Sequence, residues 1–121
     1  MLFPELEPGP VIVCPGPLSE SDRTPVALQA FHLLRTYHHP EAHLVFTGRP
    51  SRPGYGHVLN RLILELGLHQ VHFMPHLDDE LRRALEVRAD VLLSRVDASP
   101  ARVAVALSNA LDNLAAKAPA R

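Results

Sequence analysis

The sequence has 121 residues, the length of one compact domain rather than two. Its formal net charge of −1 excludes the basic balance of a general nucleic-acid binder, and one cysteine, Cys14, excludes a disulfide framework. No apolar run reaches the roughly 18 residues of a membrane span, and the first residues lack the basic start of a signal peptide. We therefore expect a cytoplasmic protein without a membrane span.

Four short apolar runs predict the strands. They are continuous rather than alternating, which is typical of strands that are covered on both faces of a sheet. The predicted strands are residues 11–14, 44–47, 71–73 and 91–93. Cys14 lies in the first of them, where we expect a buried and inert thiol rather than a reactive one.

Segments with helical periodicity separate these runs. Thr24 is predicted to cap the first helix with Pro25 at its first position, where a missing N–H costs nothing. The second helix ends at Gly67, and its apolar face carries Val58, Leu59, Leu62, Ile63 and Leu66. Acidic residues 78–80 begin the third helix, and residues 99–116 form the fourth.

Strand and helix alternate four times, which predicts an α/β fold in a single domain spanning residues 1–121. We expect a Rossmann-like three-layer sandwich: a four-stranded parallel sheet in the order 3-2-1-4, with helices on both faces. The third and fourth strands then lie at the edges. Exposed edges favour pairing, so we expect a homodimer through the fourth strand or the last helix.

The loop after the second strand favours phosphate binding. Arg49 and Arg52 stand there beside Gly48 and Gly54, next to a predicted helix start. Guanidinium groups, exposed backbone amides and a helix dipole together suit a phosphate. The alternative is that both arginines are solvated loop charges.

Eight histidines raise the question of a metal site. His69, His72 and His76 are close in sequence, but spacings of three and four place ligands poorly around a short strand. We interpret the histidines as scattered surface groups and expect no metal ion.

Several short motifs, in this order, resemble a known domain. They are Gly16-Pro17-Leu18-Ser19, then His39-Pro40-Glu41-Ala42 before the strand that leads to Gly48, then Glu65-Leu66-Gly67-Leu68, Asp79-Glu80-Leu81 and Ala89-Asp90-Val91. Residues 11–93 thus resemble the nucleotide-sugar-binding C-terminal domain of retaining glycosyltransferases with the GT-B fold, family 4 or group 1.

The resemblance implies a function and a site. The domain would bind a nucleoside-diphosphate sugar and, completed by a separate acceptor-binding domain, would transfer the sugar without a further cofactor. The diphosphate turn would lie at the first-loop glycine, and the nucleotide would contact the ends of the second and third strands. The implied nucleotide-binding residues are Gly16, Arg23, Gly48, Arg49, His76, Leu77 and Leu81.

The sequence departs from the resembled family at functional positions. Pro17 replaces an arginine, Asp22 and Arg23 replace a Lys-Gly pair, and Pro75 replaces a glycine. The usual pair of glutamates after the fourth strand is missing, and Asp97 is the acid nearest to its place. We therefore assign no catalytic residue and expect no catalysis by the chain alone. A non-catalytic relic or engineered binding or assembly module, and an unrelated module for a small phosphorylated ligand, stay open as alternatives.

Overall fold

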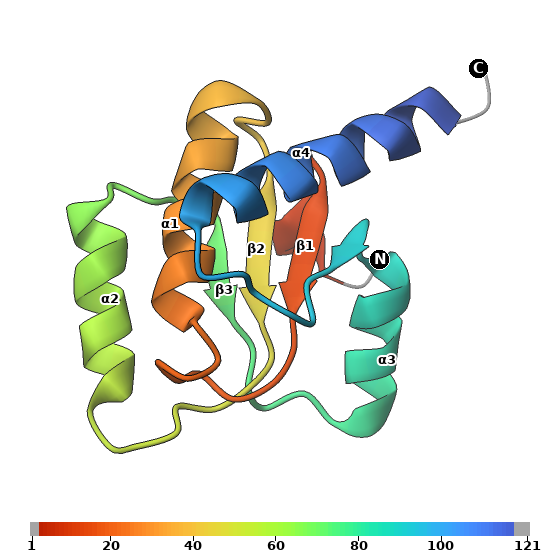
Figure 1. Ribbon diagram of the computed structural model, residues 1–121. Coiled ribbons are helices and arrows are strands. Elements are labelled where there is room, and N and C mark those ends of the chain that lie inside the picture. Colours follow the sequence, from red (N-terminus) through yellow and green to blue (C-terminus); the bar gives the residue numbers. More distant parts are fainter. Residues whose placement is uncertain (1–2, 118–121) are drawn as a thin grey trace.

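The computed structural model describes residues 3–117 as alternating strands and helices (Figure 1). A 3-10 turn, η1 (Pro4–Leu6), precedes the first strand. The elements follow in this order: β1 (Val11–Cys14), α1 (Thr24–Tyr37), β2 (His43–Phe46), α2 (Tyr55–Glu65), β3 (Val71–Phe73), α3 (Asp79–Arg88), β4 (Val91–Leu92) and α4 (Pro100–Lys117). No helix within residues 3–117 is long and apolar enough to cross a membrane.

The four strands form one parallel sheet in the order β3-β2-β1-β4. This confirms the predicted Rossmann-like fold and strand order. The strand limits differ slightly, since β2 begins at His43 and β4 ends at Leu92. All strands point the same way in Figure 1, and their carboxyl ends open onto the loops along the bottom of the view.

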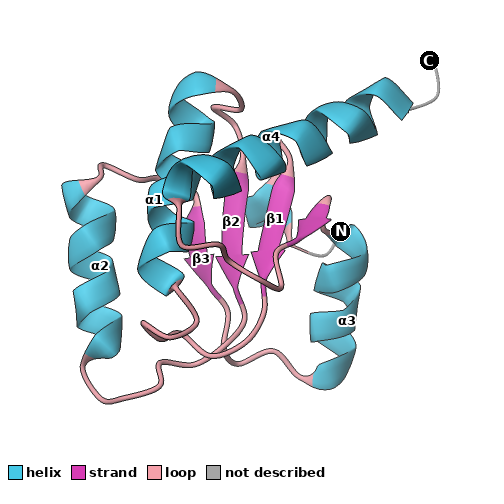
Figure 2. Ribbon diagram, in the orientation of Figure 1, coloured by secondary structure: helices cyan, strands magenta, loops and turns pink. Residues whose placement is uncertain are grey.

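Helices cover both faces of the sheet, as predicted (Figure 2). α1, α2 and α4 pack over one face, where Ile12 of β1 enters a core that includes Phe31 and Leu107. α3 and η1 cover the other face, where Val11 and Val13 join Leu85. Alternate residues of one strand therefore enter two different cores, which explains the continuous apolar runs.

The start of α1 corrects one prediction. Arg23, not Thr24, is the N-cap; its backbone φ is 58° and its side chain caps nothing. The Thr24 hydroxyl instead accepts a hydrogen bond from the Ser19 backbone N–H at 3.0 Å. α3 is capped as its acidic start indicates, because the Asp78 carboxylate accepts from the Leu81 N–H at 2.8 Å.

The apolar face predicted for α2 is confirmed except at one residue. Leu59 is fully buried, and Leu62, Ile63 and Leu66 pack against the core, whereas Val58 is 49% exposed. α2 contacts the rest of the domain along one narrow stripe, so a residue at the margin of the apolar face stays in solvent. Gly67 follows the helix with a φ of 63°, consistent with the predicted stop.

Two histidines form a pair on the sheet, which corrects their interpretation as scattered surface groups. His43 is 3% exposed, and its Nδ1 lies 3.0 Å from Nε2 of His72 on the neighbouring strand. The two rings stack with centroids 5.2 Å apart, and the Pro8 carbonyl lies 2.9 Å from His43 Nε2. The pair connects β2, β3 and the segment before β1. Within residues 3–117, no three His, Cys, Asp or Glu side chains are grouped to hold a metal ion.

We predict that stability falls in mild acid because of this pair. Burial, and secondarily the neighbouring His43, lower the pKa of His72 below its ordinary value of 6.5, while Glu5 acts weakly against them. Below pH 6.5 the unfolded chain therefore binds more protons than the folded chain, so the free energy of unfolding decreases as the pH falls. Chemical denaturation between pH 7.5 and 5.5 measures this decrease.

The variant His72→Gln is the control for that measurement, because glutamine can hydrogen-bond to His43 but does not titrate. It should lose less stability than the wild type over the same pH interval. An equal loss in the two proteins would show that other groups cause the acid sensitivity.

Candidate functional site

The loops after β1 and β2 stay paired beyond the ends of their strands. The Leu18 N–H donates to the Arg49 carbonyl at 2.9 Å, and the Ser51 N–H donates to the Leu18 carbonyl at 2.9 Å. Leu18 and Pro50 form an isolated parallel bridge. The parallel pairing of β1 with β2 is interrupted around Gly16 and resumes between Leu18 and Pro50. The two loops therefore leave no open space between them at the carboxyl ends of β1 and β2.

Gly48 permits this closure. A Cβ added at Gly48 would lie 1.6 Å from the Gly16 carbonyl oxygen and 3.1 Å from Cα of Pro17. Gly16 itself has a φ of 96° and faces open space. Of these two predicted site glycines, Gly48 is required by backbone packing, and Gly16 is free to approach a ligand.

The segment that follows in the first loop is bonded to itself and to the core of the fold. The Ser19 hydroxyl donates to the Asp22 carboxylate and accepts from the Asp22 N–H. The Arg23 guanidinium donates to the Val96 carbonyl at 3.0 Å, which links this loop to the loop after β4. Neither charged side chain is directed at an open hollow.

Cys14 at the end of β1 is not an activated nucleophile. Burial, assisted by the negative charge of Asp22, raises the pKa of its thiol to about 11. The sulfur is therefore protonated at neutral pH, in agreement with the inert thiol expected from the sequence.

A first hollow, here called the α3 hollow, lies between these loops and α3. Its volume is about 460 Å³, and it is lined by Pro15, Gly16, Thr47, Gly48, Arg82, Arg83 and Glu86. Arg82 donates to Asp79 at 2.8 Å. Arg83 has no carboxylate within 4.0 Å among residues 3–117. No local pattern in the sequence indicates these arginines, because only the crossover of α3 to the second face brings them to Gly16.

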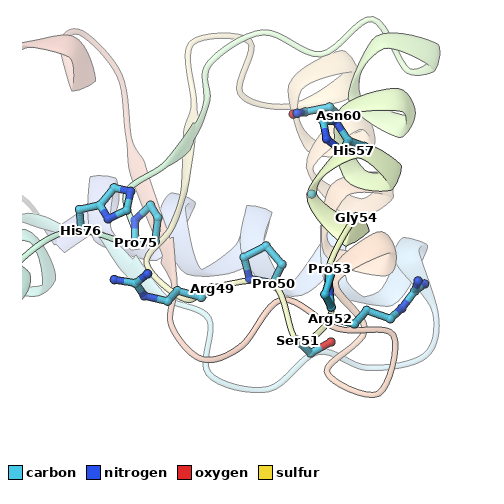
Figure 3. Close-up of a pocket in the computed structure, with 11 residues that line it drawn as sticks. Arg49, Pro50, Ser51, Arg52, Pro53, Gly54, His57, Asn60, Pro75 and His76 are labelled. Carbon is cyan, nitrogen blue, oxygen red and sulfur yellow. The ribbon is translucent and has the colours of Figure 1, made fainter.

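A second hollow, here called the α2 hollow, lies on the other side of the β2 loop (Figure 3). Its volume is about 650 Å³, and its lining is Arg49, Pro50, Ser51, Arg52, Pro53, Gly54, Gly56, His57, Asn60, Pro75 and His76. Figure 3 shows Arg49 and His76 together on one wall and His57 with Asn60 on the opposite wall. Two of the predicted nucleotide-binding residues, Arg49 and His76, are thus brought together here.

The predicted site residues are therefore divided between places. Gly16 and Gly48 line the α3 hollow, while Arg23, Leu77 and Leu81 line neither hollow. Leu77 packs against the core beneath α3, and Leu81 is 36% exposed on that helix. The sequence did not predict this division, because Gly48 and Arg49 are neighbours in the chain. In the structure they line hollows on opposite sides of the β2 loop.

The loop after β4 presents no acid of the expected kind. The Asp97 carboxylate accepts from the Ser99 N–H at 3.3 Å, and the Ser99 hydroxyl accepts from the Arg102 N–H at 3.3 Å. Both side chains shape the start of α4. No glutamate follows Glu86 in the sequence.

The fold and these hollows define a Rossmann-like α/β domain with its ligand-facing loops at the carboxyl edge of the sheet. The chain is similar to the C-terminal domain of a glycosyl transferase group 1 family protein, LpcC, from Francisella tularensis. The TM-score is 0.60 at 20% sequence identity, over 82% of this chain and 55% of that domain. The resemblance predicted from the sequence is confirmed at the level of the fold. No model of a known family and no curated protein matches the sequence.

We predict that Gly48→Ala destabilises the protein by about 2–4 kcal/mol, because the methyl group must displace the backbone at Gly16. Urea denaturation gives the free energy of unfolding. Gly56→Ala is the matched control: its Cβ would meet only the Pro50 side chain at 3.8 Å, and alanine favours the helix. Equal stability of Gly48→Ala and wild type would contradict the close approach of the two loops.

Proposed function

We propose that this chain binds the nucleoside diphosphate of an activated sugar in the α3 hollow, as the donor-binding part of a glycosyltransferase-like protein. The observation that carries the proposal is the position of Arg82 and Arg83 across that hollow from Gly16. A glycine with an open face allows the backbone to approach a diphosphate, and arginines supply its counter-charge. The fold shared with a glycosyltransferase domain supports the choice of ligand.

The arginines of α3 compensate for what the first loop lacks. Pro17 has no N–H to donate, Asp22 is held by Ser19, and Arg23 is held by the Val96 carbonyl. The one cation of the first loop is thus bonded to the loop after β4. Arg83 is the strongest remaining donor, because Arg82 also serves Asp79. Glu86, in the same hollow, would accept hydrogen bonds from ribose or sugar hydroxyls.

Sugar transfer itself would need a second, acceptor-binding domain. Asp97 and Ser99 are engaged at the start of α4, so the loop after β4 directs no carboxylate at a donor sugar. Binding of the donor and transfer of the sugar would accordingly be divided between two parts of an assembly. The part represented by this chain would bind the nucleotide.

We predict that UDP, GDP or ADP, free or as the sugar conjugate, raises the melting temperature. A ligand at about 100 times its Kd stabilises the folded state by about 2.7 kcal/mol, which corresponds to a shift of several degrees in a domain of this size. Arg83→Gln should lower the affinity for the nucleotide that raises the melting temperature about tenfold, as measured by calorimetric titration.

Arg61→Gln is the matched control, since Arg61 is 84% exposed on α2 and loses the same charge when substituted. It should bind the nucleotide like the wild type. The absence of a shift with every nucleotide, or an equal loss in the two variants, would refute the proposed nucleotide site.

A non-catalytic assembly module is the second candidate, and the exposed edge of the sheet favours it. β4 is an edge strand of two residues, and its Leu92 is 48% exposed. An apolar side chain on an open edge favours pairing with another strand. We propose that two copies of the chain associate along β4, with or without nucleotide.

We predict a dimer in light scattering coupled to size exclusion, and a monomer for Leu92→Lys, because a charge at the paired edge is costly to bury. Val87→Lys is the control, since Val87 is 87% exposed on α3 and is not part of β4. A wild-type monomer at high concentration would exclude this association.

A further inference from the structure

The α2 hollow has an uncompensated positive charge. Its lining contains Arg49, His57 and His76, and no aspartate or glutamate. Among residues 3–117, Arg49 has no carboxylate within 4.0 Å. A concave surface with a guanidinium, two imidazoles and no acid attracts an anion.

The fourth basic residue of the lining is turned outward. The Arg52 guanidinium donates to Glu20 at 3.1 Å and lies 4.8 Å from the ring centre of Tyr55. Figure 3 shows its side chain extending away from Arg49 and His76. Arg52 thus pairs with the nearby acid outside the hollow, and Arg49 is the arginine of the lining that has no carboxylate partner among residues 3–117.

The start of α2 adds to this charge. Gly54, the N-cap, has a φ of 82°, and the N–H groups of Tyr55 and His57 donate to the Arg52 and Gly54 carbonyls at 3.3 and 3.1 Å. The first turn of α2 carries no acidic residue. The positive end of the helix dipole therefore lies at Gly54, Gly56 and His57, which line the hollow. It adds to the positive charge of Arg49.

An apolar slot continues the hollow. Its volume is about 230 Å³, and its lining is Leu18, Gly48, Pro50, Gly56, Asn60, Phe73 and Pro75. The slot and the α2 hollow share Pro50, Gly56, Asn60 and Pro75, so one ligand can reach both. Phe73 is 36% exposed and stacks on Phe46 at 5.5 Å, which presents a fixed ring to the slot.

We propose that the α2 hollow and this slot together bind a phosphomonoester with an apolar ring. The phosphate would lie against Arg49 and His76, on the wall where Figure 3 shows them together, and the ring would enter the slot beside Phe73. Arginine binds phosphate oxygens in fixed directions, and an aromatic face favours a planar partner. The two proposed sites lie on opposite sides of the β2 loop, and their linings share only Gly48.

The experiment is calorimetric titration with phenyl phosphate, inorganic phosphate and phenol. Phenyl phosphate should bind at least tenfold more tightly than either of the others, because it alone fills both parts of the site. Arg49→Gln should weaken phenyl phosphate about tenfold, whereas Arg61→Gln should leave it unchanged. Equal effects of the two substitutions, or equal affinity for phenyl phosphate and inorganic phosphate, would overturn the proposal.

A second variant tests the slot without endangering the fold. Gly56 lies in α2, where a longer side chain favours the helix and would extend from a Cβ 3.8 Å from Pro50. Gly56→Met should fill the slot and reduce the affinity for phenyl phosphate towards that for inorganic phosphate. Unchanged binding of phenyl phosphate by a folded Gly56→Met protein would place its ring elsewhere and refute the slot.

Two measurements separate this site from the nucleotide site. Arg83→Gln should bind phenyl phosphate like the wild type, and UDP should not displace phenyl phosphate. Displacement by UDP, or loss of binding in Arg83→Gln, would assign both ligands to one site and overturn the proposal. A protein that binds phenyl phosphate but no nucleotide would refute only the proposed function.

Discussion

Gly48 lies against the Gly16 carbonyl so closely that no side chain fits between the two loops. The close approach follows from the pairing of Leu18 with Arg49 and Ser51, which continues the β1–β2 ladder past the ends of the strands. The middle of the carboxyl edge is therefore closed, and ligands can approach only on its two sides. The α3 hollow and the α2 hollow are those two sides.

The same closure determines which cations can serve a ligand. The segment between Leu18 and α1 bonds to itself, and its Asp22 and Arg23 are used for structure. Positive charge must come from elements that flank the closed loops: Arg83 from α3 on one side and Arg49 from the β2 loop on the other. The two hollows therefore take their positive charge from different elements of the fold.

The sequence predicted the strands and their order well, because each strand contributes to two cores and is apolar along its whole length. It could not predict the pairing of His43 with His72, which depends on the register between β2 and β3. Arg83 was missed for a similar reason: only the crossover of α3 brings it to Gly16. Local hydrogen bonds also overrode propensity at Thr24, whose hydroxyl serves Ser19 instead of its own helix.

In the proposed function, donor binding and sugar transfer depend on different groups. Cations beside the β1 and β2 loops can hold a ligand. Retaining sugar transfer also needs polar groups that stabilise the charge developing at the sugar carbon in the transition state. The loop after β4 would have to supply such groups here, and its Asp97 and Ser99 shape the start of α4. Transfer by an assembly that contains this chain would therefore depend on groups from its partner.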